Sequence, residues 1–316
     1  MNTRGVKTII IILLCAANLF FMYNTLLLNR RIRYIPADMI ESAAKILTAE
    51  HNIEISPQYI LARRPVHSIH EFIYSDANYH NIVRSFSGAT DEEISNGRHT
   101  THDDGIAFNV GEYRFRFDDF MLLEIIKSDY WEGDTAANIE TMEMIAAYYT
   151  EISASDLEAA RNIIHDFLSQ YPEQSPLTDF NIIGLRRENG RDKVLINQTM
   201  DGLLISSHTA LVVISDSPNG SRDVKYFFGR WYFGDFIDYH ETPLLDAVNI
   251  LFRSLEQDSR LFEEGTARLV GMEKQFHIIP HQIERFYLAL SWILSFDDGE
   301  SVRTFSYDMI TGRRNN

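Results

Sequence analysis

The chain has 316 residues, of which 45% are hydrophobic and 23% charged, as in globular proteins that bury a core. This composition excludes a disordered, collagen-like or low-complexity chain. Residues 34–316 contain 24 basic and 45 acidic residues, a net charge of −21, and such a body repels phosphate backbones, so no nucleic-acid partner is expected. The single cysteine, Cys15, excludes an intramolecular disulfide and a cysteine-based zinc site.

The first predicted element is a transmembrane helix over residues 8–28, TIIIILLCAANLFFMYNTLLL. These residues carry no charge, and as a helix they are about 31 Å long, close to the ~30 Å hydrocarbon core of a bilayer. The alternative is a signal peptide cleaved after the small residues Ala16 and Ala17. Because the apolar run continues to Leu28, we expect an uncleaved anchor that contacts the lipid bilayer.

Basic residues lie on both sides of this segment, and we expect them to flank the membrane: Arg4, Lys7, Arg30, Arg31 and Arg33. Their nearly even distribution barely distinguishes the two orientations. A head of only seven residues, 1–7, has no room for a function of its own. We therefore expect a single-pass protein of the cell membrane with a cytoplasmic N-terminus and an extracellular body.

Asn18 lies near the middle of the predicted span. An amide in hydrocarbon commonly finds a hydrogen-bond partner on a neighbouring helix. The alternative is a hydrogen bond to its own backbone or to water. We expect the contact with a partner helix to involve Asn18, Ala16, Ala17 and Phe21.

A first α+β domain is predicted over residues 34–150. Apolar residues at helical spacing predict an amphipathic helix over 37–50, and Ile53–Ile55 then alternates as a strand does. Turn-forming residues without an apolar period predict an exposed loop over 87–104. Short strands are predicted near 70–75, 79–86, 105–110 and 112–117, the last two joined by a tight turn at Val110 and Gly111.

A second α+β domain is predicted over residues 151–316. The spacing of Ser155 and Glu158 is that of a capping box, which predicts a helix that starts near residue 156. Asn189-Gly190 and Asn219-Gly220 predict the turns of two antiparallel hairpins. A third helix is indicated by the apolar spacing of residues 244–255. It is followed by strands near 266–278, 284–296 and 301–308, with a last turn at residues 297–299.

The order of these elements, one helix and then an antiparallel meander, occurs at least twice. The fold class is therefore predicted to be α+β, with an N-terminal transmembrane helix followed by tandem helix-plus-antiparallel-meander domains. We expect the helices to pack on one face of curled sheets.

Residue patterns for catalysis or cofactor binding are not found in the sequence. Two histidine pairs, His67 with His70 and His99 with His102, lack the helical His-Glu-x-x-His arrangement of zinc enzymes, and we expect solvated loop histidines. No nucleophile elbow, phosphate-binding loop or calcium loop is present. We therefore predict no enzyme activity, cofactor or metal. The aromatic run over 226–233 could form a ligand platform, but the inner face of a sheet is the expected role.

Three stretches of the sequence carry a resemblance to a known family. The head with Lys7, the apolar run and Asn18 form the first, and VLINQTMDGLLISSHTALVVISD at 194–216 forms the second and strongest. The third comprises GRWYF, the helix at 244–256 and the final YDMITGR. The chain resembles the YycI regulatory proteins, relatives of YycH, which are membrane-anchored accessory proteins of a Gram-positive two-component system that controls the cell wall.

The resemblance implies signal transduction by contact. The membrane helix would pack against the transmembrane region of a sensor histidine kinase, with a YycH-like protein as a second partner outside the cell. Two other hypotheses remain open from the sequence. One is a membrane-anchored inhibitor or chaperone-like binding domain for a secreted protein, and the other is an envelope hydrolase that uses acidic residues.

Overall fold

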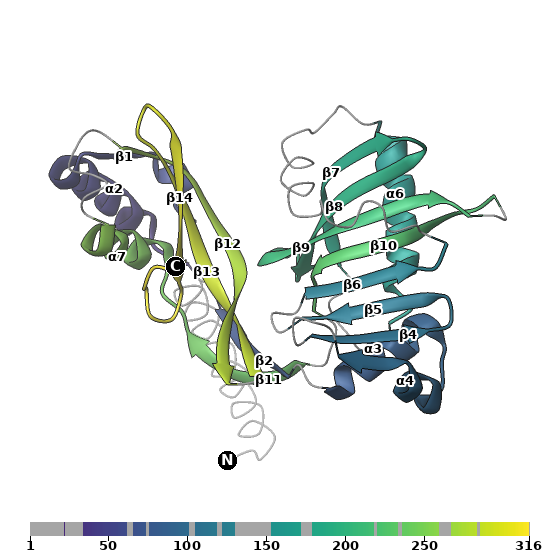
Figure 1. Ribbon diagram of the computed structural model, residues 1–316. Helices are drawn as coiled ribbons and strands as arrows, with labels where there is room; N and C mark the ends of the chain where they lie inside the picture. Colours follow the sequence, from purple (N-terminus) through teal and green to yellow (C-terminus); the bar gives the residue numbers. More distant parts are fainter. Residues whose placement is uncertain are drawn as a thin grey trace, which may run out of the picture. The chain divides into compact units, whose positions relative to one another are not determined.

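In the computed structural model the chain has an α+β fold, with an antiparallel-rich curled sheet and five α-helices among the described residues (Figure 1). The residues that the structure describes are residue 22 and residues 34–61, 66–73, 76–100, 105–118, 122–129, 153–171, 179–217, 220–232, 236–258, 267–282 and 285–315. They divide into two compact units. Unit 1 comprises Met1–Ser68, His240–Lys274 and Leu290–Asn316, and unit 2 comprises Ile69–Tyr239 and Gln275–Ala289.

Unit 1 combines two helices with a small sheet. The helices are α2 (Ala37–His51) and α7 (Ala247–Asp258), drawn on the same face of the sheet in Figure 1. Strand β1 (Ile53–Ile55) runs parallel to β12 (Ala267–Gln282), and β13 (Arg285–Asp297) pairs antiparallel with β14 (Val302–Asp308). The short 3-10 helix η1 (Pro57–Tyr59) follows β1. β12 and β13 continue into unit 2, where β13 pairs with β2 (Val66–Ile73), whose neighbour is β11 (Phe236–Pro243).

Unit 2 contains two meanders, and among the described residues the first is preceded by two helices and the second by one. The first consists of α3 (Asp76–Ser87), α4 (Asp91–Gly97), β3 (Arg98–Thr100), β4 (Ile106–Val110), β5 (Tyr113–Phe117) and β6 (Leu122–Lys127). The second consists of α6 (Ala154–Leu168), β7 (Phe180–Glu188), β8 (Arg191–Met200), β9 (Leu203–Asp216) and β10 (Arg222–Arg230).

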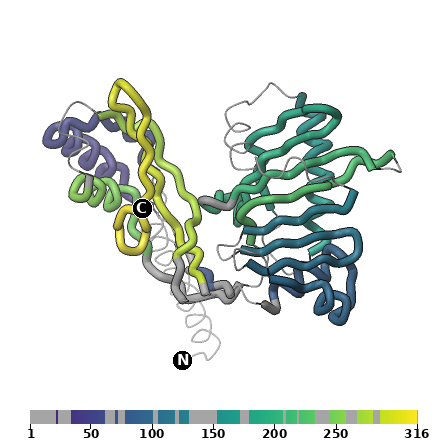
Figure 2. The backbone as a smooth tube through the Cα atoms, in the orientation of Figure 1, coloured from purple at the N-terminus to yellow at the C-terminus, as the bar shows by residue number. Residues whose placement is uncertain are grey.

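The last strands of the two meanders pair antiparallel, with Tyr226 opposite Ile126. The strand order is therefore β3–β4–β5–β6–β10–β9–β8–β7, which Figure 2 traces as one curved ladder. The helices of both meanders lie on the same face of it (Figure 1).

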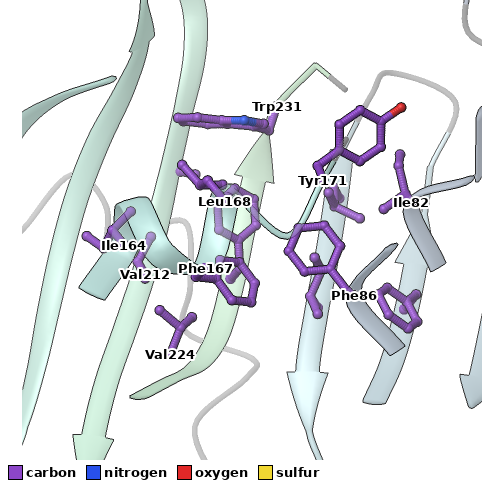
Figure 3. Packing of buried hydrophobic residues seen from close by; sticks show 14 of the residues in the cluster. Ile82, Phe86, Ile164, Phe167, Leu168, Tyr171, Val212, Val224 and Trp231 are labelled. Atoms are coloured by element: carbon purple, nitrogen blue, oxygen red, sulfur yellow. The ribbon is translucent and has the colours of Figure 1, made fainter. Parts of the chain in front are cut away.

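Aromatic side chains from both meanders form one core beneath the helices (Figure 3). Phe86 of α3 contacts Phe167 of α6, with ring centroids 4.8 Å apart. Phe167 in turn stacks on Phe227 of β10 at 6.0 Å, and Phe227 meets Trp231 edge to face at 5.5 Å. Such pairs add to the free energy gained by burying apolar surface. The core therefore joins the two meanders.

Several predicted elements are confirmed. Helix α2 matches the predicted 37–50 and buries the predicted stripe of Ile40, Ala43, Ala44 and Leu47. The turn Asn189-Gly190 connects β7 and β8, and both residues have positive φ, 51° and 76°, as a tight hairpin turn requires. The third predicted helix corresponds to α7, and the three strands that follow it to β12, β13 and β14.

Two predictions for the first domain are wrong. The strand predicted at 79–86 is the helix α3, because Ile82, Val83 and Phe86 lie on one helical face and are buried there. The loop predicted at 87–104 contains α4 and β3. Thr90 and Glu93 form a capping box at the start of α4, in which the Glu93 carboxylate accepts from the Thr90 backbone N–H at 2.8 Å.

The start of the helix predicted near residue 156 is displaced by two residues. Helix α6 begins at Ala154, and its N-cap is Ser153, whose hydroxyl accepts a hydrogen bond from the backbone N–H of Asp156 at 3.1 Å. The predicted cap Ser155 lies inside the first turn. The predicted boundary between residues 150 and 151 falls within residues 130–152, outside the described residues, and unit 2 is continuous in sequence across it.

Candidate functional site

The predicted membrane contacts and flanks lie outside the described residues. They are Arg4, Lys7, Ala16, Ala17, Asn18, Phe21, Arg30, Arg31 and Arg33. In the part of the chain that the structure describes, no helix has the length and apolar character needed to cross a bilayer. The site described below is therefore built from residues of the body.

Three of the four histidines predicted in loops lie on strands, His67 and His70 on β2 and His99 on β3, and His102 lies outside the described residues. His70 lies half-buried on strand β2, where its ring meets Phe276 at 6.5 Å. Glu71 is buried, and adjacent strand residues point to opposite faces, so these two side chains diverge. His99 is exposed on β3. Across the described segments, no three His, Cys, Asp or Glu side chains are grouped as metal ligands would be.

The aromatic run around β10 packs in a core, as expected, but its side chains are buried on both faces of the sheet and not on one inner face alone. Phe227 and Trp231 belong to the core under the helices, whereas Tyr226 joins a smaller buried cluster with Leu195 and Leu211. A bulge between Val224 and Tyr226 shifts the alternation there. Residue Phe233 lies outside the described residues.

Gln198 connects two of the segments that carry the family resemblance. Its side-chain amide is fully buried and pairs with the backbone of Tyr232, donating to the carbonyl at 2.8 Å and accepting from the N–H at 3.0 Å. Gln198, which belongs to segment 194–216, thus holds the GRWYF segment against the end of β8. This contact is structural, because both polar groups of the amide are bonded to backbone.

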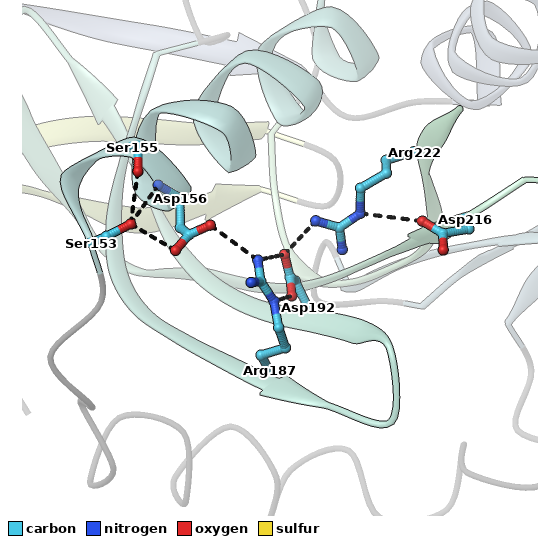
Figure 4. Close-up of polar contacts among 7 residues, drawn as sticks. All are labelled: Ser153, Ser155, Asp156, Arg187, Asp192, Asp216 and Arg222. Carbon is cyan, nitrogen blue, oxygen red and sulfur yellow. Dashed lines mark hydrogen bonds and ion pairs between the residues drawn. The ribbon is translucent and has the colours of Figure 1, made fainter. Parts of the chain in front are cut away.

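Charged side chains from α6 and from the strands of the second meander meet around Asp192 (Figure 4). Asp192 is 1% exposed, and its carboxylate accepts hydrogen bonds from Arg187 Nε at 2.7 Å and from Arg187 Nη2 at 3.1 Å. Arg222 Nη1 donates to it at 2.8 Å. Arg187 also reaches Asp156 in the first turn of α6 at 3.3 Å, and Arg222 lies 3.5 Å from Asp216. The network therefore ties α6 to four strands.

These contacts shift the pKa values of Asp192, Asp156 and Arg187 so that the charged form of each is favoured. Burial raises the pKa of Asp192, but the hydrogen bonds from Arg187 and Arg222 outweigh this effect and hold the pKa below its usual value. The hydrogen bond from the Ser153 hydroxyl lowers the pKa of Asp156. The hydrogen bond to Asp192 raises the pKa of Arg187. With both oxygens occupied by guanidinium groups, Asp192 is poorly suited to accept a proton from a substrate.

Two lysines form a second charged group, one at the end of β6 and one near the start of β10. Lys225 is buried, and its Nζ donates to Asp129 at 2.5 Å and to Ser217 at 2.7 Å. Lys127 pairs with Asp223 and lies over the Tyr113 ring at 5.3 Å. Lys225 and Asp129 thus form an ion pair in which the lysine side chain is buried and the Asp129 side chain is 40% exposed.

The Asp192 network was not predicted, although the sequence contains a local signal for part of it. In a hairpin with a two-residue turn, the residues that flank the turn face each other in pairs. With Asn189-Gly190 as the turn, Arg187 stands opposite Asp192, and the structure has this register. The contribution of Arg222, 30 residues away, has no comparable local signal.

Comparison with known proteins gives similarity in structure only. No family model and no curated protein matches the chain. An uncharacterized protein from Eubacterium rectale matches with a TM-score of 0.45 at 9% identity, over 88% of this chain and 98% of that one. The Bacillus megaterium YpeB C-terminal domain matches with a TM-score of 0.27 at 14% identity, over 78% of this chain and 97% of that domain.

Proposed function

We propose that the chain is a non-enzymatic, single-pass membrane regulator that modulates a cell-wall-controlling sensor histidine kinase. The observation that carries the proposal is the sequence of residues 8–28, 21 residues without a charge, directly ahead of a folded body whose first helix begins at Ala37. Within this proposal the helix contacts the kinase through Asn18 and its neighbours, and the body outside the cell binds a second, YycH-like protein.

The resemblance to the YycI family supports the proposal through the roles of the shared segments. Segment 194–216 forms β8, the Asp201-Gly202 turn and β9, and Gln198 fastens the GRWYF segment to it. The final YDMITGR segment closes unit 1 through Asp308, which accepts from the backbone N–H of Thr311 at 2.6 Å. The resembling segments that lie in the body therefore make contacts that hold parts of its fold together.

The body also offers a surface suited to recognition. Among the described residues β7 pairs only with β8, so this nine-residue strand is an open edge of the unit 2 sheet. An edge strand can take up a strand from another protein through backbone hydrogen bonds. This property suits a regulator that acts by contact, and it equally suits an anchored inhibitor or chaperone-like domain for a secreted protein.

The experiment that separates these functions compares two variants in cells that carry a reporter of kinase output. The regulator requires that Asn18→Leu change the output while the protein remains expressed and anchored, since the apolar substitution keeps the span and removes its amide. The inhibitor or chaperone function requires that a secreted fragment starting at Tyr34 retain full activity. An inactive fragment together with a changed output in the Asn18→Leu variant supports the function as a regulator. A fully active fragment together with an unchanged output in that variant rejects it.

A further inference from the structure

A groove with a volume of 530 Å³ lies in unit 1 between α2 and the segment that runs from β1 into η1. One wall consists of α2 residues, namely Glu41, Ala44, Lys45, Thr48 and Ala49, and the other of Ile55 and Pro57. All of them lie within residues 34–61, a continuous described segment of unit 1. Its volume is within the range of sites that bind ligands and peptide side chains.

The groove is a fixed feature of the α2–β1 pair. The large apolar residues of α2, Ile40 and Leu47, point into the core, which leaves the small side chains of Ala44 and Ala49 along the groove. The Thr48 hydroxyl donates to the carbonyl of Ile53 at 2.9 Å, and this bond sets the spacing between helix and strand. Because Ala44 and Ala49 have small side chains, the space between helix and strand stays open in the folded chain.

An open strand edge runs beside the groove. Strand β1 pairs with β12, with Ile53 opposite Ala267 at one end and Ile55 opposite Leu269 at the other. It has no second strand partner in the described part of the chain. Its alternation is buried, exposed, buried, so Ile55 faces the groove side while Glu54 faces away. A strand added at this edge would gain backbone hydrogen bonds from β1 and place every second side chain in the groove.

Charges at the rim indicate what the added segment would carry. Glu41 and Lys45 stand one helical turn apart, both exposed, and neither forms an ion pair with a described residue. Opposite charges one turn apart favour a segment with a basic and an acidic side chain around its apolar residue. A charged rim of this kind disfavours an acyl chain as the occupant.

We propose that this groove binds an extended peptide segment of another protein, added as a strand to β1. The segment has apolar side chains at alternate positions, which enter between α2 and Pro57. It also carries charged side chains that pair with Glu41 and Lys45. The site lies in unit 1 and needs neither the open edge of β7 nor a membrane contact of residues 8–28.

The test uses the full chain in nanodiscs and a displayed library of random nine-residue peptides. Selected peptides are synthesised with a fluorophore, and their affinity is measured by anisotropy. We expect alternating apolar residues in the selected sequences. Ala49→Trp, which fills the groove from its exposed rim, should weaken binding about tenfold or more. Ile46→Trp is the matched control, because Ile46 is exposed on the same helix but does not line the groove, and it should leave affinity unchanged.

Two further measurements distinguish strand addition from other modes. Methylation of single backbone nitrogens should weaken binding at every second position, since only alternate N–H groups face β1. Lys45→Glu should shift the selected sequences toward basic residues. The proposal is overturned if no peptide is enriched, if Ala49→Trp binds the peptides as the parent does, or if the peptides bind as helices with apolar residues three and four apart.

Discussion

The buried carboxylate of Asp192 stabilises the protein in a defined pH range. Its pKa in the folded chain is lowered by Arg187 and Arg222, against about 3.9 for an unfolded aspartate. The stabilisation is therefore present above pH ~4 and is lost as the pH falls through the folded pKa. Because Arg187 is half-exposed, the effect is smaller than for a fully buried pair.

We expect Asp192→Asn to lower the free energy of unfolding by about 1–3 kcal/mol at pH 7, as two guanidinium groups lose their charged acceptor. Urea unfolding of parent and variant at pH 7 and pH 3 provides the measurement, and the difference should shrink at the lower pH. Asp216→Asn is the control: its side chain is 75% exposed, so its effect should stay within about 0.5 kcal/mol. Equal effects of the two substitutions would contradict the role given to burial.

Gly229 is required where β10 and β9 approach each other. A Cβ at this position would overlap the carbonyl oxygen of Thr209 and the backbone of Ala210. Gly229→Ala should therefore destabilise the protein by about 2 kcal/mol or more. Gly271→Ala in β12 is the matched control, since its Cβ would meet Ser295 at an ordinary 3.5 Å. Thermal unfolding monitored by circular dichroism should show a lower midpoint for the first variant only.

At the scale of elements, Asp308 organises the C-terminal turn of unit 1. Its Oδ1 accepts from the backbone N–H groups of Ile310 at 3.0 Å and Thr311 at 2.6 Å, and from the Thr311 hydroxyl at 2.8 Å. The turn then holds α7, because Gln257 donates to the carbonyl of Gly312 at 2.7 Å. The described end of the chain, residues 308–315, is thus part of the fold.

Asp308→Ala leaves these donors without their acceptor, and we expect a loss of about 1–3 kcal/mol in the free energy of unfolding. Hydrogen exchange should show faster exchange at Thr311 and in α7. Arg313→Ala is the control, since Arg313 takes part through its backbone N–H and C=O. Unchanged exchange in α7 of the Asp308 variant would show that the turn does not hold the helix.

Local signals explain which elements the sequence predicted. The β7–β8 hairpin was predicted correctly because positive φ at both Asn189 and Gly190 is a property of the turn alone. Strand β6 was missed, since it lies between β5 and β10 and buries Ile125 on one face and Ile126 on the other, so its sequence does not alternate. The β-branched residues Ile82 and Val83 favoured a strand at α3, but the tertiary core selected the helical face.

For the site, the sequence could predict only what lies close along the chain. The pairing of Arg187 with Asp192 follows from the hairpin register, whereas the third partner, Arg222, and the contact between Gln198 and Tyr232 depend on how distant strands align. The α2–β1 groove depends on which helical face turns to the core. Neither the partner of β7 nor that of the groove is encoded in a local pattern.

At the scale of the whole molecule, charge is distributed unevenly between the units. Unit 2 contains 30 acidic and 14 basic residues, a net charge of −16, whereas residues 34–316 within unit 1 contain 15 and 10, a net charge of −5. A partner of unit 2 is therefore expected to present a basic surface. The rate of association should fall as salt is raised from 50 to 300 mM, because the attraction is screened.

The central claim is that residues 8–28 stay in the membrane and contact the span of a kinase. Photocrosslinking amino acids placed singly along 8–28 in the full chain, in native membranes, test it most directly. We expect adducts with a membrane-spanning kinase from positions that recur every three to four residues around Asn18 and Phe21, and lipid adducts from the others. Lipid adducts alone from every position, or recovery of the chain without these residues in the medium, would contradict the claim.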